Sequence, residues 1–255
     1  MGKGIFDRPI AHRGLHDRDK GIIENSRSAF DAAIASGFAI ECDLQLTRDG
    51  VPVVFHDDDM QRLLGIPGGI REAPSDIVLK TPLLGSATGD CPQTFGQLLE
   101  QVAGRTLLQV ELKHQLRGKT KPLAAVAVNN VSRYSGPLCF ESFDPWLLIA
   151  ARQAGYRGKL GIITEHYKAT AADDPFYDGL KLSDRVILRH LLHWPLTRFD
   201  FLSVDKTALA LPAVRLFRAF GKPVTSWTIR SAEQASAALG NADQIVFEGF
   251  LPQSA

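Results

Sequence analysis

Residues 39–56 read AIECDLQLTRDGVPVVFH, two apolar runs on either side of an Asp-Gly turn signal at Asp49 and Gly50. An Asp-Gly pair between β-rich runs is typical of a tight hairpin. The connection is too short to hold the crossover helix that joins parallel strands. The stretch therefore predicts an antiparallel hairpin with strands over Ala39–Leu46 and Val51–His56.

Outside this hairpin, β-rich runs alternate with helical patterns along the chain. The other predicted strands cover Pro9–His12, Leu107–Leu112, Pro137–Ser142, Leu160–Thr164, Phe201–Val204, Val224–Thr228 and Gln244–Glu248. The predicted helices cover Ser26–Ser36, Thr94–Val102, Lys121–Val131, Pro145–Ala154, Ser183–Leu192, Pro212–Phe220 and Ala232–Leu239. Repeated strand–helix units are typical of an α/β protein with a parallel sheet. When the returning arm of the hairpin is set aside, eight parallel strands remain, which predicts a TIM (β/α)8 barrel.

Length and charge favour one domain. The chain has 255 residues, 45% of them hydrophobic, and 29 basic residues against 28 acidic ones. A chain of this size suits a single barrel, so we predict one domain over residues 1–255. Residues 57–93, which follow the second barrel strand and its hairpin, show no regular pattern, and we expect them to form a lid insertion over the pocket. The near balance of charge gives no reason to expect binding to nucleic acid.

The cysteines and the hydropathy pattern bear on the compartment. Cys42, Cys91 and Cys139 are odd in number and far apart, which argues against a disulfide framework. No stretch is apolar enough to span a bilayer, and the first residues do not resemble a signal peptide. We therefore expect a cytoplasmic protein, and the sequence leaves its oligomeric state open.

Three acidic residues stand at the ends of predicted barrel strands. Glu41 and Asp43 lie two positions apart on one strand, so their side chains point to the same face. Glu111 ends the next barrel strand, with Lys113 on the same face. Carboxylate oxygens are the ligands that Mg²⁺ and Ca²⁺ prefer, so this trio predicts a metal site. The alternatives are a strand that shows polar residues to solvent and a structural ion pair between Glu111 and Lys113.

Two histidines and an arginine fall at the same edge. His12 and His56 each close an apolar run, so both should lie at one rim of the barrel, where imidazoles can exchange protons near neutral pH. Arg13 can bind two nonbridging phosphate oxygens at once, and Lys113 can supply a point charge to another. Trp227 ends a late strand, where it either offers a flat apolar wall to a small polyol or packs in the core. Together these residues predict a metal-assisted phosphate site.

With these residues in place, the chain resembles the glycerophosphodiester phosphodiesterases, a TIM-barrel family, in particular its short cytoplasmic bacterial members. The resemblance rests on His12-Arg13-Gly14, Glu24-Asn25-Ser26, Glu41-x-Asp43, Thr47-x-Asp49-Gly50, His56-Asp57, Glu111-x-Lys113, Ser142-Phe143-Asp144 and Trp227-Thr228. These motifs span nearly the whole chain and are densest over residues 12–57. The chain departs from the family pattern at Ile23, where proline is usual, and at Phe247-Glu248, where a Thr-Asp pair is usual. We expect the second change to alter contacts with the alcohol of the substrate.

The resemblance implies a reaction and a set of roles. The reaction is hydrolysis of a small glycerophosphodiester to sn-glycerol 3-phosphate and an alcohol, with water or the substrate's own 2-hydroxyl as nucleophile. The implied metal ligands are Glu41, Asp43 and Glu111, for one Mg²⁺ or Ca²⁺ ion, or Mn²⁺ in their place. His12 and His56 would be acid and base in an order left open, and Arg13 and Lys113 would bind the phosphate.

Two other functions are open from the sequence. The first keeps the chemistry but takes a lysophospholipid, as a phospholipase D-like enzyme. It would need an apolar channel under the insertion, for which Met60, Leu63, Leu64 and Ile66 are candidates, unless they form a small core of their own. The second is a noncatalytic barrel that binds phosphodiesters or a partner protein.

Overall fold

The computed structural model describes residues 4–115, 120–167 and 180–252. Its strands are β1 (Ile10–Ala11), β2 (Ala39–Leu46), β3 (Pro52–Val54), β4 (Leu108–Leu112), β5 (Leu138–Ser142), β6 (Lys159–Thr164), β7 (Phe201–Asp205), β8 (Val224–Ile229) and β9 (Gln244–Phe247). Its helices are the 3-10 helix η1 (Arg18–Lys20) and α1 (Arg27–Ala35), α2 (Gln61–Leu64), α3 (Ser75–Lys80), α4 (Phe95–Val102), α5 (Thr120–Val131), α6 (Pro145–Gln153), α7 (Leu182–Arg189), α8 (Trp194–Thr197), α9 (Pro212–Ala219) and α10 (Ala232–Leu239). None of the helices in these described ranges is both long and apolar enough to cross a membrane.

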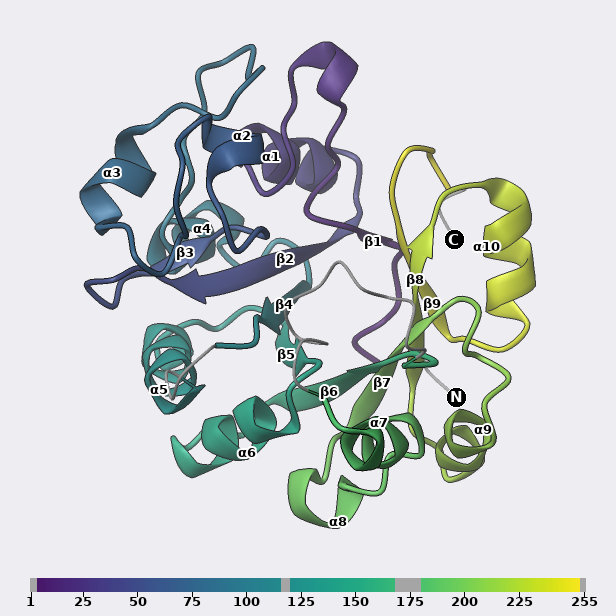
Figure 1. The fold of residues 1–255 in the computed structure, drawn as a ribbon. Helices are drawn as coiled ribbons and strands as arrows, with labels where there is room; N and C mark the ends of the chain where they lie inside the picture. The colour runs from purple at the N-terminus through teal and green to yellow at the C-terminus, as the bar shows by residue number, and fades with distance from the viewer. Residues whose placement is uncertain (1–3, 116–119, 168–179, 253–255) are drawn as a thin grey trace.

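The predicted hairpin is present. β2 and β3 pair antiparallel, with Leu44 opposite Val54 and Leu46 opposite Pro52. The remaining strands pair in parallel in the order β1-β9-β8-β7-β6-β5-β4-β2, and β1 pairs with β2 to close the ring. Helices surround this ring of strands in Figure 1. The predicted TIM (β/α)8 barrel is thereby confirmed, with β3 outside the set of parallel strands.

Local sequence explains where the outer helices begin. The Ser26 side chain accepts a hydrogen bond from the backbone of Ala29 at the start of α1, and Thr94 forms a capping box with Gln97 at the start of α4. Asp144 caps α6 in the same way. The apolar faces of these helices pack on the outside of the barrel in one large buried cluster. Capping and burial together therefore fix the helical shell.

A smaller buried cluster fills one end of the barrel. It contains Phe6, Ile10, Ala39, Leu107, Cys139, Phe201 and Val246. Most of these residues lie at or just before the N-terminal ends of the strands, so that end of the barrel is packed and apolar, while Val246 of β9 also lines the pocket above it. Polar side chains are left for the C-terminal ends of the strands, where active sites of such barrels lie.

The insertion at residues 57–93 has a core of its own. It contains α2 and α3, which the sequence did not predict because helices of four and six residues are too short to show a period. Met60, Leu63 and Leu64 are buried in a cluster with Val53 and Phe55 of the hairpin segment. Figure 1 shows both helices at one side of the barrel, beyond β3.

Gly14 sets how closely the loop after β1 approaches α1. Its φ is +80°, and a Cβ there would lie 2.9 Å from the backbone carbon of Ala29 in α1. We expect Gly14→Ala to lower the free energy of unfolding by about 2–5 kcal/mol, since left-handed strain costs about 1–2 kcal/mol and overpacking about 1–3. Urea unfolding at neutral pH measures this change.

Gly37→Ala is the matched control. Gly37 has a φ of +75°, but a Cβ there would meet no described atom within 4 Å, so only the backbone strain applies. Equal losses in the two variants would contradict a steric role for Gly14.

Candidate active site

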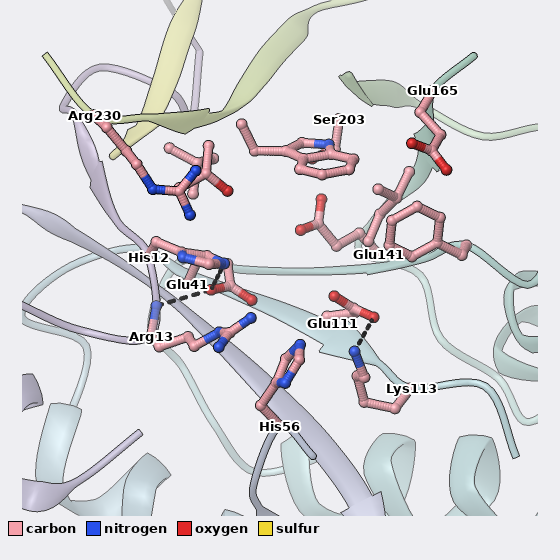
Figure 2. A pocket seen from close by; sticks show the side chains of 15 residues that line it. His12, Arg13, Glu41, His56, Glu111, Lys113, Glu141, Glu165, Ser203 and Arg230 are labelled. Carbon is pink, nitrogen blue, oxygen red and sulfur yellow. Dashed lines mark hydrogen bonds and ion pairs between the residues drawn. The ribbon is translucent and has the colours of Figure 1, made fainter. Parts of the chain in front are cut away.

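Three carboxylates converge at the C-terminal ends of two neighbouring strands. The parallel register of β2 and β4 places Asp43 beside Glu111, and Glu41 lies two residues earlier on the same face of β2. One ligand oxygen from each of Glu41, Asp43 and Glu111 lies within 4.8 Å of the others. The sequence-predicted trio is therefore brought together, and Figure 2 shows Glu41 and Glu111 facing the same space.

Burial makes it costly for all three carboxylates to be ionised at once. It raises the pKa of Glu41 well above its ordinary value, and the charges of Asp43 and Glu111 raise it further. Burial also opposes ionisation of Asp43, but the positive charges of His56, Lys113 and Arg13 outweigh it and hold the pKa of Asp43 well below its usual range. A buried set of oxygen donors that raise one another's pKa fits a hard divalent cation.

The loop after β1 folds over the carboxylates. The backbone N–H of Arg13 donates to Glu41 Oε2 at 2.9 Å, and the guanidinium Nε lies 3.4 Å from Asp43 Oδ2. Asn25 Nδ2 donates to the same Asp43 oxygen at 2.8 Å. Arg13 and Asn25 both have a φ of +55°, a conformation that non-glycine residues rarely adopt. The loop thus places two hydrogen-bond donors, the Arg13 N–H and Asn25 Nδ2, and the Arg13 guanidinium beside Glu41 and Asp43.

Lys113 reaches the same cluster from the end of β4. Its Nζ lies 3.2 Å from Glu111 Oε1 and 3.7 Å from Asp43 Oδ1. The ammonium therefore lies beside the acid trio, and it lines the pocket together with Arg13.

His12 is held by a carboxylate from the other end of the chain. Its Nδ1 donates to Glu248 Oε2 at 2.5 Å, and its Nε2 lies 3.9 Å from Glu41 Oε2. Burial lowers the pKa of His12 to about 4, against the raising effect of the Glu248 bond. At neutral pH the ring is therefore uncharged, and Nε2 is the nitrogen able to accept a proton.

Glu248 links His12 to a second residue of the pocket wall. It binds His12 through Oε2 and accepts Arg230 Nε at 2.8 Å through Oε1. The segment after β9 runs next to the segment after β1, where the His12 backbone N–H donates to the Phe247 carbonyl, and this brings Glu248 to the ring. The expected effect of the Phe247-Glu248 pair on contacts with the alcohol stays a prediction.

His56 is placed by a glutamine that the sequence did not indicate. Gln45 Nε2 lies 3.1, 2.9 and 2.8 Å from the carbonyl oxygens of Phe55, His56 and Asp57, so it holds the turn that follows β3. His56 Nδ1 donates to Asp57 Oδ1 at 2.8 Å. Figure 2 shows the His56 ring at the pocket, between Arg13 and Lys113.

All the predicted site residues except the buried Asp43 line one pocket of about 420 Å³. Trp227 forms part of its wall, with its ring centroid 5.6 Å from that of Phe143 in an edge-to-face arrangement. Both rings line the pocket, so the structure places Trp227 at the site. No residue of the insertion 57–93 is among the described residues that line it, so the insertion stands beside the pocket.

The pocket has further lining residues to which the sequence reasoning gave no role, although Phe143 and Thr228 belong to motifs quoted from the sequence. They are Glu141, Phe143, Ile163, Glu165, Ser203, Thr228, Arg230 and Val246. Glu141 is aligned with Glu111 in the register of β4 and β5, which was the signal that could have revealed it. Burial raises the pKa of Glu141 to about 8, so at neutral pH it is mainly a protonated, hydrogen-bonding acid.

Comparison with known proteins gives one family. The model of the Glycerophosphoryl diester phosphodiesterase family matches residues 12–245. A phosphodiesterase of Oleispira antarctica, solved in complex with the product sn-glycerol-3-phosphate, has a TM-score of 0.75 at 21% identity, covering 95% of this chain and 93% of that one. A glycerophosphodiester phosphodiesterase of Thermotoga maritima has a TM-score of 0.67 at 23% identity, covering 93% and 92%. At such identities these two structures show the fold alone.

One curated protein is similar to this chain over a much shorter stretch. The uncharacterised protein YqiK of Bacillus subtilis is 37% identical over 70 residues, which span 27% of this chain and 28% of that protein. The match is therefore local and says nothing about the rest of either chain.

The low pKa of His12 predicts a pH-dependent stability. Unfolded His12 has its ordinary pKa of 6.5, whereas in the fold the pKa is about 4, so between these values the unfolded chain binds more protons. Stability should then fall as the pH falls, by about 2 kcal/mol between pH 6.5 and about pH 5 from this residue alone. Urea unfolding across this window measures the slope.

His12→Gln is the informative variant, since an amide can still donate to Glu248 but does not titrate. We expect a flatter stability curve between about pH 5 and 6.5. Parallel curves for the variant and the parent protein would refute the assignment.

Proposed function

Because the chain belongs to the glycerophosphoryl diester phosphodiesterase family, a family of phosphoric diester hydrolases, we propose that it hydrolyses glycerophosphodiesters to sn-glycerol 3-phosphate and an alcohol. One observation carries the proposal. Gathered around one pocket are three carboxylates suited to a divalent cation, two histidines, and two cationic side chains able to bind phosphate, Arg13 and Lys113. Together these groups can supply the charge stabilisation and the proton transfers for cleavage of a phosphodiester.

Glu41, Asp43 and Glu111 would hold the divalent cation, with Mg²⁺, Ca²⁺ and Mn²⁺ as the candidates. When bound, such an ion lowers the pKa of the attacking hydroxyl and shares the negative charge of the phosphate. The proposal is supported by the all-oxygen donor set and by the burial of Glu41 and Asp43.

Arg13 and Lys113 would bind the nonbridging phosphate oxygens. Arg13 is held by Glu24, whose Oε1 accepts from Nη1 at 2.7 Å, and it lies beside Asp43 through Nε. Held on two sides, the guanidinium is preorganised to stabilise charge that develops in the transition state. Lys113 would add a compact charge on the Glu111 side of the pocket.

The two histidines would divide the proton transfers. Uncharged His12 suits the base, which takes the proton of the nucleophile on Nε2, whether that nucleophile is water or the substrate's 2-hydroxyl. We assign the acid to His56, because His12 takes the part of the base and Asp57 holds the His56 ring at Nδ1. As the bond from phosphorus to the leaving oxygen breaks, His56 would give its proton to the departing alkoxide.

The wall opposite the histidines would receive an organic part of the substrate. Phe143 and Trp227 offer apolar surface there, and Glu141, Glu165 and Ser203 offer groups for hydroxyls. The lysophospholipid alternative loses support, because Met60, Leu63 and Leu64 are buried in the insertion's own core. We therefore favour a small alcohol. The free thiols of the three cysteines suit a reaction in the cytoplasm.

Metal dependence is the first test. With glycerophosphocholine as substrate, the purified protein should release sn-glycerol 3-phosphate, detected enzymatically. A chelator should remove at least about 99% of the activity, and Mg²⁺, Ca²⁺ or Mn²⁺ should restore it. Asp43→Asn should lose the restoration, because it removes one ligand charge.

Two results would count against the proposal. Release that is indifferent to chelator would exclude the metal site, and no release from any glycerophosphodiester with any of these ions would exclude the activity, leaving the noncatalytic barrel.

The histidines give the second test. His12→Ala and His56→Ala should each lower kcat by about 10²–10⁴-fold, the usual contribution of a positioned acid or base, while circular dichroism stays that of the parent. His190→Ala serves as control, since His190 is exposed at the end of α7 and lies outside the pocket lining. Full activity in either of the first two variants would remove that residue from the mechanism.

A further inference from the structure

Arg62 of the insertion binds two carboxylates at once. Its Nε and Nη2 donate to Asp57 Oδ2 and Oδ1 at 2.6 and 2.7 Å. Its Nη1 and Nη2 donate to Glu24 Oε2 and Oε1 at 2.7 and 2.8 Å. The guanidinium therefore makes a two-bond contact with a carboxylate on each of two edges, which fixes the planes of both acids.

Each of these carboxylates continues to a residue of the site. Asp57 Oδ1, which Arg62 binds, also accepts His56 Nδ1 at 2.8 Å. Glu24 Oε1, which Arg62 binds as well, also accepts Arg13 Nη1 at 2.7 Å. The contacts form an unbroken chain of five residues: His56, Asp57, Arg62, Glu24 and Arg13. We call this chain the Arg62 clasp.

We propose that Arg62 is a positioning residue, which holds the His56 ring and the Arg13 guanidinium at a fixed separation across the phosphate position. The inference rests on the proposed function for the roles of His56 and Arg13. The insertion 57–93 then has a function other than lining the pocket, because it holds Arg62 in place.

The anchorage of Arg62 supports this task. Arg62 lies in α2 next to Leu63 and Leu64, which are 2% and 4% exposed in the insertion's own core. The Leu63 carbonyl also accepts the Leu84 N–H at 2.8 Å. The backbone of Arg62 is therefore fixed by apolar packing, while its side chain reaches the site.

Geometry rather than charge is the contribution of Arg62. Its side chain is 41% exposed, so each ion pair by itself adds little to stability. Asp57 and Glu24 have only 16% and 14% of their side chains exposed, and each shares an oxygen between Arg62 and a site residue. Without the guanidinium, the carboxylates of Asp57 and Glu24 could rotate. His56 and Arg13, which they hold, would then change orientation.

Arg62→Gln should lower kcat/KM by about 10–100-fold, the scale of a small misplacement of reacting groups. We expect a split effect: KM rises because Arg13 binds the phosphate, and kcat falls because His56 moves. Arg62→Lys keeps the charge but lacks the fork, so it should recover less than about a tenth of the lost activity. Guanidinium ion at millimolar concentration should partly rescue Arg62→Ala, because it can bind between Asp57 and Glu24 in place of the missing side chain.

Arg71→Gln is the matched control. Arg71 lies in the same insertion and pairs with Asp58, an acid outside the clasp. We expect this variant to change stability but to leave kcat/KM within about twofold of the parent. A double variant with Arg62→Gln and Glu24→Gln should lose less than the product of the single losses, because both changes break one chain.

A readout without turnover separates this inference from the proposed function. The ring NMR signals of His56 should move in Arg62→Gln and stay in place in Arg71→Gln. If the parent protein shows no turnover but the His56 signals still move in Arg62→Gln, the clasp is supported and only the proposed function is overturned. Unmoved His56 signals, or an Arg62→Gln variant within twofold of the parent in kcat/KM, would overturn the clasp.

Discussion

The repulsion among buried carboxylates at the ends of β2 and β4 is the constraint on which the site depends. The parallel register puts Asp43 beside Glu111, and the burial of Glu41 and Asp43 weakens the screening of these charges by water. The chain answers with positive groups from separate segments: Arg13 after β1, His56 after β3 and Lys113 after β4. Arg13 and Asn25 adopt a strained left-handed backbone conformation. The hydrogen bonds that this conformation allows them to donate to Glu41 and Asp43 offset the strain. A bound cation would complete the same compensation.

The barrel makes this concentration of charge tolerable by dividing its interior. Large apolar side chains such as Phe6 and Phe201 fill one end, so the core that stabilises the fold lies away from the ionisable groups. The acids occupy the other end, where solvent can reach the pocket. The large apolar cluster between the strands and the surrounding helices holds the strand register, and that register determines which acids become neighbours.

The sequence predicted those features that depend on local pattern. The Asp-Gly turn gave the hairpin, and the ends of apolar runs gave His12, His56 and the acid trio, because strand ends of a barrel meet at one rim. It missed contacts between distant segments. Glu248 lies 236 residues from His12 along the chain, and nothing in its neighbours indicates that its side chain turns toward the ring. Gln45 was hidden for a different reason: a glutamine on a strand is ordinary until its three carbonyl acceptors are known.

The two histidines sit in parallel arrangements that differ mainly in burial. Each donates Nδ1 to a carboxylate, and each carboxylate is itself held by an arginine: His12 by Glu248 and Arg230, His56 by Asp57 and Arg62. The arginine on the far side of each acid fixes the position of the carboxylate, and the carboxylate orients the ring. The His12 side chain is 16% exposed and that of His56 is 30% exposed. Desolvation lowers the pKa of the more buried His12 and keeps its ring uncharged at neutral pH, which suits the proposed base.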